Sequence, residues 1–186
     1  MTALPPRVAR LSDGRIAFLL SPQERVIVGG YLAGLTDRVA PPLDDPADED
    51  DDAAVAERDP VLARLYPDAI PADPSASAAF RDLVIRDLAD LRLARLATVV
   101  ETIDATTIDD AQAAAWLGAL NDLRLVLGTE LGVAEDDPEV IAEDDPDAER
   151  RLVYAYAAWL EDQLVEVLAG ALPDLADDDD AGAGGA

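Results

Sequence analysis

The stretch that most constrains the fold is residues 111–133, AQAAAWLGALNDLRLVLGTELGV, the longest run with helical periodicity and few acids. On a helical wheel that turns about 100° per residue, its leucines gather beside Trp116 within an arc of roughly 120°. These leucines are Leu117, Leu120, Leu123, Leu127 and Leu131. We expect Asp109 or Asp110 to cap this helix, Gly132 to end it, and the leucine side to face the core.

Arg124 projects into the same arc as the leucines. An unpaired charge in an apolar site is very costly, so a buried arginine needs a partner. We predict that Arg124 is substantially buried and hydrogen-bonded to Asp87, to Gln163, or to a backbone carbonyl at a helix C-terminus. In this interpretation Arg124 locks a helical core, and its neighbours Asn121 and Asp122 are further candidate interaction residues.

The N-terminal segment predicts a β-hairpin, because apolar residues flank the pair Asp13-Gly14, which is typical of a tight turn. The register expected from this turn pairs Leu11 with Ile16 and Ala9 with Phe18. Two strands alone are not stable in water, so the apolar side of the hairpin should pack on helices.

The first helix should begin after Ser21, since Ser21 and Glu24 form a capping box and Pro22 occupies the first helical position. It is expected to run to about residue 38. Gly29-Gly30 in its middle costs about 1 kcal/mol per glycine relative to alanine. We favour close packing of another backbone against this face over a hinge.

A long helix is predicted over residues 78–102, with Ser77 as its N-cap. Its apolar arc of roughly 200° predicts that it is largely buried. Three arginines project into that arc, Arg81, Arg92 and Arg95. Either their stems pack while their heads reach water, which we favour, or they form an arginine patch at a partner surface.

The last helix is predicted over residues 147–172, with Trp159 on its apolar face and Gln163 projecting into the middle of that face. It is the expected cover of the leucine side of residues 111–133. A short helix is expected over residues 61–66, between Asp59-Pro60 and Pro67.

Together these elements predict a mainly α fold: a helical bundle of about four main helices with an N-terminal β-hairpin, in one domain over residues 1–172. Residues 41–57 are acidic and have almost nothing to bury, so we expect a disordered linker inside this domain. Residues 173–186 should form a disordered acidic, Gly/Ala-rich tail. The EDDP repeats at 135–138 and 143–146 could bind calcium or magnesium, but their spacing is not that of an EF-hand, and a solvated loop is favoured.

Composition excludes several kinds of chemistry. The chain has no Cys and no His, and all its 14 basic residues are Arg, so disulfides, metal sites with thiolate or imidazole ligands and Ser-His or Cys-His catalysis are impossible. We find no phosphate-binding glycine loop or nucleophile elbow, and predict a non-enzymatic protein without catalytic residues, cofactor or metal. The net charge of −26 opposes strong DNA binding, although Arg7, Arg10 and Arg15 could form a local basic ribbon.

No signal peptide and no apolar run of membrane-spanning length is found, which predicts a soluble cytoplasmic protein.

The two C-terminal helices carry a resemblance to a known family. WLGALNDLRLVLGTELGV at 116–133, the acidic EDD at 135–137 and YAYAAWLEDQLVEVL at 154–168 resemble an actinobacterial family first catalogued as a domain of unknown function. DPVLARLYP at 59–67 and the hairpin-then-helix start are similar too. Members are commonly described as AosR-like oxidative-stress transcriptional regulators and are often encoded beside the Clp protease adaptor ClpS.

The resemblance implies a cytoplasmic regulator of the stress response that acts through protein contacts, such as with a sigma factor or RNA polymerase. Two features depart from the family. Thiol sensing is impossible without Cys, and Glu130 stands where the family is expected to favour Arg. Two alternatives remain: an accessory factor or adaptor of Clp-type proteolysis, and an acidic protein that mimics DNA.

Overall fold

The computed structural model describes residues 5–39, 59–66, 74–134, 141–142 and 144–170, with residues 74–86 described as backbone only. The expected linker over 41–57, the expected tail over 173–186 and most of the EDDP repeats lie outside the described residues. So does the side chain of Arg81.

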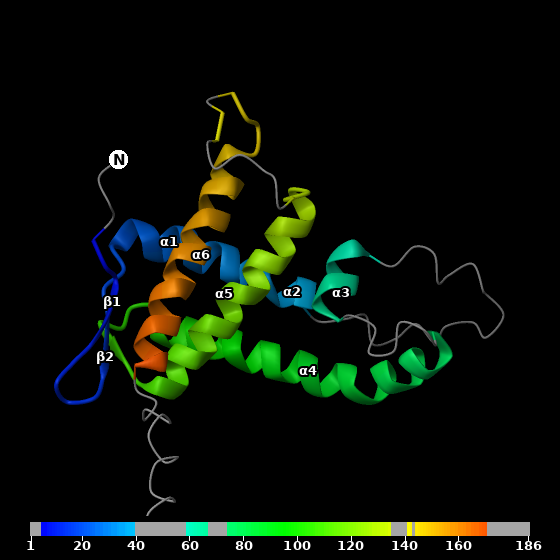
Figure 1. Ribbon diagram of the computed structural model, residues 1–186, viewed down its shortest axis with the longest axis horizontal. Helices are drawn as coiled ribbons and strands as arrows, with labels where there is room; N and C mark the ends of the chain where they lie inside the picture. The colour runs from blue at the N-terminus through cyan, green and yellow to red at the C-terminus, as the bar shows by residue number, and fades with distance from the viewer. Residues whose placement is uncertain (1–4, 40–58, 67–73, 135–140, 143, 171–186) are drawn as a thin grey trace, which may run out of the picture.

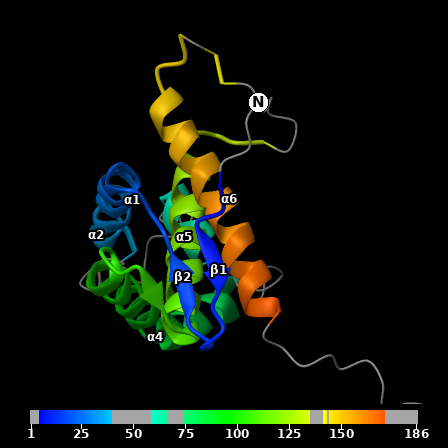
Figure 2. The ribbon, with the colours of Figure 1, turned by 90° about the vertical axis from the view of Figure 1, so that its left-hand side faces the viewer.

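The described chain is mainly helical with a small N-terminal sheet, as predicted. Its elements in order are β1 (Val8–Arg10), β2 (Ile16–Phe18), α1 (Pro22–Gly34), α2 (Thr36–Val39), α3 (Pro60–Leu65), α4 (Pro74–Thr102), β3 (Thr107–Ile108), α5 (Asp110–Glu130) and α6 (Ala148–Ala169). Figure 1 shows α5 and α6 side by side, with α1 crossing behind them and the long helix α4 crossing below. Seen from the side, the hairpin lies against one end of this bundle (Figure 2). None of the described helices is both long enough and apolar enough to cross a lipid bilayer.

The hairpin has a different register from the one predicted. The observed pairs are Val8 with Phe18, Ala9 with Ala17 and Arg10 with Ile16. The turn is one residue longer than assumed: the Leu11 amide donates to the Arg15 carbonyl at 2.8 Å, and the Gly14 amide donates to the Leu11 carbonyl at 3.0 Å. Gly14 has φ +85°, the left-handed conformation that such a three-residue hairpin loop requires.

A third strand, which was not predicted, completes the sheet. β3 pairs antiparallel with β2 in the order β1-β2-β3, with Ile16 opposite Ile108. Two residues are too few to show a strand periodicity in sequence. As the central strand, β2 is the most buried, and its Ile16 and Phe18 have no exposed surface.

The capping box at the start of α1 is confirmed. The Glu24 amide donates to Ser21 Oγ at 3.3 Å, and the Ser21 amide donates to Glu24 Oε2 at 2.6 Å. The helix ends at Gly34 and α2 follows, so the single helix expected to residue 38 is interrupted. The backbone that was expected to pack against Gly29-Gly30 is not found there: an added Cβ at Gly29 would lie 3.3 Å from the side-chain atom Ile103 Cδ1, and one at Gly30 would meet no described atom within 4 Å.

Glu24 gives a pH-dependent prediction. Burial alone would raise the pKa of this carboxyl, but hydrogen bonds from Ser21 and Arg7 hold the pKa below its ordinary value. A lowered pKa means that the carboxylate stabilises the fold above the pKa of the unfolded chain, and that this contribution is lost as the pH falls through the folded value. Glu24→Gln should therefore cost about 1 kcal/mol of unfolding free energy at neutral pH, and the difference from wild type should shrink below about pH 4.

Urea denaturation across this pH range measures that difference, with exposed Glu166→Gln as the matched control. A difference for Glu24→Gln that stays constant with pH would contradict the prediction.

α5 is the central helix and is capped as predicted. The Gln112 amide donates to Asp109 Oδ1 at 2.8 Å, and the Asp109 amide donates to Gln112 Oε1 at 3.0 Å. At the other end, Gly132 has φ +61°, and the Val133 amide donates to the Gly128 carbonyl at 2.9 Å. This is the glycine-terminated helix end that the sequence predicted.

The buried side of α5 is wider than the leucine side predicted for it. Leu117 and Leu131 are only partly buried, whereas Asp122 is buried. The other residues buried along α5 are Ala113, Trp116, Ala119, Leu120, Leu123, Val126 and Leu127. α6 packs along this helix, as predicted, and contributes Val153, Ala157, Leu160 and Leu164 to the core.

α4 is less buried than predicted, and it begins at Pro74 rather than after Ser77. Of its described side chains, Leu91 and Val100 are exposed, while Leu96 and Val99 are buried. In Figure 1 only the C-terminal half of α4 lies under the bundle, and its N-terminal half projects away from it. Even within the C-terminal half, Leu91 and Val100 lie on a side that no described element covers. A wide apolar arc therefore has a neighbour along only part of its length.

Candidate functional site

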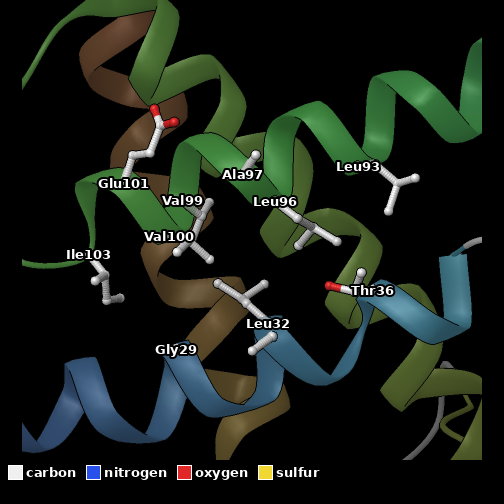
Figure 3. Close-up of a pocket in the computed structure, with 11 residues that line it drawn as sticks. Gly29, Leu32, Thr36, Leu93, Leu96, Ala97, Val99, Val100, Glu101 and Ile103 are labelled. Carbon is white, nitrogen blue, oxygen red and sulfur yellow. The ribbon is translucent and has the colours of Figure 1, made fainter.

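An open apolar groove lies between α1–α2 and the C-terminal half of α4, and we call it the α1/α4 groove. It encloses a volume of about 650 Å³. Figure 3 shows Leu32 of α1 facing Leu96 and Val100 of α4 across this space. Leu32 and Leu96 form a buried floor, while Val100 on the wall is 62% exposed.

Both walls of the groove follow helical spacing. α1 and α2 contribute Gly29, Leu32, Ala33 and Thr36, and α4 contributes Leu93, Leu96, Ala97 and Val100. These positions recur at i, i+3, i+4 and i+7, so each helix turns one continuous side toward the groove. Gly29 lacks a side chain, and Ile103 fills the space at that end.

The charges around this groove are acidic. Glu101 lines it, Asp37 follows Thr36, and Asp90 lies one turn before Leu93. None of these three acids has an ion-pair partner among the described residues. The nearby Arg25 donates to the carbonyls of Leu20, Ile103 and Ala105, and Arg38 pairs with Glu130, so neither guanidinium is available to the groove.

Arg124 has a different partner from those predicted. Its Nη1 donates to Glu161 Oε2 on α6, and its guanidinium lies 5.4 Å from the centre of the Tyr154 ring. The side chain is 34% exposed, so it lies at the edge of the core and not within it. Asp87 is exposed on α4, and Gln163 is engaged elsewhere, so both proposed partners are wrong.

The most buried ion pair joins Arg92 and Asp122. The Nε of Arg92 lies 3.1 Å from Asp122 Oδ1, and the two side chains are 11% and 4% exposed. Arg92 Nη2 also donates to the Leu65 carbonyl at 2.8 Å, and its guanidinium lies 4.6 Å from the centre of the Tyr66 ring. Burial raises the pKa of Asp122, and Arg92 opposes that shift. This pair therefore connects α3, α4 and α5, and Arg92 is neither a solvated head nor part of a partner surface.

Arg95, the last of the three arginines predicted to lie in the apolar arc of the long helix, lies over Gly118. A Cβ added at Gly118 would meet Arg95 Nε at 2.7 Å, so a larger residue there would make the Arg95 side chain shift. Arg95 is half-buried and has no carboxylate partner among the described residues. It is consistent with the packed stem that the sequence favoured.

The remaining predicted residues divide between core and surface. Trp116 is completely buried. Gln163 connects the hairpin to α6, because its Oε1 accepts hydrogen bonds from the backbone amides of Arg7 at 2.6 Å and Val8 at 3.3 Å. Trp159 lines a second apolar hollow, of about 570 Å³, between α1 and α6. Asn121 is exposed beside Arg124. The groove residues of α4 were missed as a site, because their periodicity predicted burial.

The hairpin arginines do not form a free basic ribbon. Arg7 pairs with Glu24 at 3.0 Å, Arg10 with Asp110 at 2.6 Å, and Arg15 with Asp13 at 2.9 Å.

Glu130 stands where the family was expected to favour Arg. It forms ion pairs with both Arg38 and Arg150, and so connects α2, α5 and α6. Within the described ranges, no group of three or more acids is arranged to hold a metal ion.

Comparisons with known proteins agree with the resemblance found in the sequence. The model of DUF2017, a domain of unknown function, matches residues 6–168. A protein of Mycobacterium tuberculosis named oxidative stress regulator AosR is 30% identical over 129 residues, which cover 60% of this chain and 59% of that protein. A protein of Mycobacterium bovis with the same name matches equally.

A protein of Mycobacterium leprae that also carries the AosR name is 28% identical over 190 residues, covering 87% of this chain and 86% of that relative. No solved structure matches the chain. Because the family model spans nearly all of the described residues, the chain belongs to the DUF2017 family.

Proposed function

We propose that this chain is a cytoplasmic, non-enzymatic regulator of the stress response, and that it acts on transcription by binding a sigma factor or RNA polymerase. The names of its relatives support the regulatory part of this proposal. The observation that carries the protein-contact part is the α1/α4 groove, whose exposed apolar wall has no cover in the described chain.

The groove fits a basic amphipathic helix of the partner. Its α4 wall from Leu93 to Glu101 spans about 12 Å at 1.5 Å per residue, enough to hold about two turns of a helix. Apolar residues of the partner at i, i+3, i+4 and i+7 would bury Val100 and Ala97. The acids on the rim, Glu101, Asp37 and Asp90, favour Lys and Arg on the flanks of that helix.

Val100→Arg tests this docking. The substitution places a long cation on the exposed wall, where it removes apolar contact and repels a basic partner, so recovery of the partner should fall about tenfold or more. The measurement is affinity capture from a lysate of the source organism, with sigma and polymerase subunits identified by mass spectrometry. Val165→Arg is the matched control, since Val165 is an equally helical, half-exposed valine of α6 outside the groove.

Two outcomes would overturn the proposal. Capture of Clp protease subunits without polymerase or sigma factor would assign the chain to proteolysis. Equal recovery of polymerase or sigma factor by Val100→Arg and wild type would place the contact away from the groove.

A further inference from the structure

A third hollow, separate from the α1/α4 groove and from the hollow lined by Trp159, has mostly polar walls. It lies where α3, α5 and α6 meet, encloses about 420 Å³, and shares no lining residue with the groove. Its polar side chains are Arg64, Asn121, Arg124, Thr129 and Tyr154, and we call it the arginine pocket.

One arginine of this pocket, Arg64, is unusual in a chain with 40 acids and only 14 basic residues. Among the described side chains, every arginine except Arg64 and Arg95 makes an ion pair. Arg64 is exposed on α3 and lines the pocket without a carboxylate of its own. The acids of the described chain therefore leave this guanidinium open to a ligand.

Arg124 is held in place on the opposite wall. Glu161 Oε2 accepts from its Nη1, and the Tyr154 ring covers its guanidinium at 5.4 Å. Gly128 makes that arrangement possible, because an added Cβ would lie 3.2 Å from Tyr154 Cε2. The Glu161 side chain is only 8% exposed, so it lies behind Arg124 and not in the mouth of the pocket. Among the described residues, Glu161 accepts from Nη1 of Arg124, and the buried Nε of Arg124 has no hydrogen-bond partner.

The pocket thus brings together two guanidinium groups from different helices and the exposed amide of Asn121, with one carboxylate behind them. Guanidinium groups bind the oxygens of phosphate in pairs, and a phosphate group carries close to two negative charges near neutral pH. The volume exceeds what a bare phosphate needs, which leaves room for the group attached to it.

We propose that the arginine pocket binds the phosphate group of a small molecule through Arg64 and Arg124, with Asn121 donating to a further oxygen. The strongly negative chain repels an anion at long range, and this repulsion should weaken binding. The two guanidinium groups attract the anion only within about a Debye length of the pocket. This site is independent of the docking proposed for the α1/α4 groove.

The test uses the full chain at low ionic strength, with inorganic phosphate, a small phosphomonoester and acetate as separate probes followed by NMR. Phosphate should shift the Nε signals of Arg64 and Arg124 and the side-chain amide of Asn121 along one saturable curve. The phosphomonoester should bind more tightly than inorganic phosphate if the extra volume holds its organic part. Acetate should bind at least about tenfold more weakly than phosphate.

Arg64→Ala should raise the phosphate dissociation constant about tenfold, and Arg64→Lys should restore part of the loss because it keeps the charge without the paired donors. Arg64 is exposed and has no ion-pair partner among the described residues, so the thermal unfolding midpoint of Arg64→Ala should match that of wild type. Arg15→Ala, on the exposed hairpin turn, is the control for loss of one positive charge. Absence of saturable shifts, equal affinity for acetate, or an equal loss in Arg15→Ala would overturn the proposal.

Discussion

Replacing Trp116 with alanine should lower the free energy of unfolding by about 3–5 kcal/mol. The indole has no exposed surface, and its ring centre lies 4.7 Å from that of Phe18 in the central strand. Its Nε1 donates to Thr102 Oγ1 at 2.8 Å, at the end of α4. The substitution therefore leaves a cavity where α4, α5 and the sheet meet, and urea denaturation followed by circular dichroism measures its cost.

Two variants separate the cavity from the hydrogen bond. Trp116→Phe keeps much of the volume, and Thr102 still donates to the Thr98 carbonyl at 2.6 Å, so we expect a loss of only about 1–2 kcal/mol. Trp159→Ala removes an indole that is only partly buried, and its cost should also be smaller than that of Trp116→Ala. A loss for Trp116→Ala no larger than for Trp159→Ala would contradict this account of the core.

The position of Trp116 in the core was predictable because it depends on local signals. The caps at Ser21 and Asp109, the left-handed Gly132 and the apolar periodicity between them each involve residues within one or two helical turns. The direction of the buried face was less accurate. The observed face of α5 is rotated by roughly 60° from the leucine side, because small residues such as Ala119 let neighbouring helices approach where no leucine marks the contact.

Contacts between distant segments were not predictable in the same way. Arg124 and Arg92 both project toward apolar sides, but which carboxylate each one meets depends on how the helices cross. Sequence spacing placed neither Glu161 opposite Arg124 nor Asp122 opposite Arg92. The observed hairpin register differs by one residue from the predicted one, because Gly14 is left-handed and closes a three-residue loop. The pair Asp13-Gly14 in the sequence does not specify the length of that loop.

The α1/α4 groove shows why a candidate site was harder to predict than the fold. The periodicity of α4 indicates an apolar side, but it does not reveal that Val100 lacks a neighbour. That absence depends on where α1 ends and how it crosses α4. The glycine pair in α1 predicted a close backbone, whereas the neighbour of Gly29 is the Ile103 side chain.

The second large effect is expected at Asp122. Asp122→Ala leaves the guanidinium of Arg92 buried beside Tyr66 without its carboxylate, and breaking a buried pair in this way costs about 3–5 kcal/mol. Arg92→Met in the same chain should recover much of that loss, because an apolar side chain of similar length removes the uncompensated charge. Asp110→Ala is the matched control on α5. The Asp110 side chain pairs with Arg10 but is 60% exposed, so its loss should lower the free energy of unfolding by less than about 1 kcal/mol. If Asp122→Ala and Asp110→Ala cost the same, or if Arg92→Met recovers nothing, the buried pair does not connect α3, α4 and α5 as its geometry indicates.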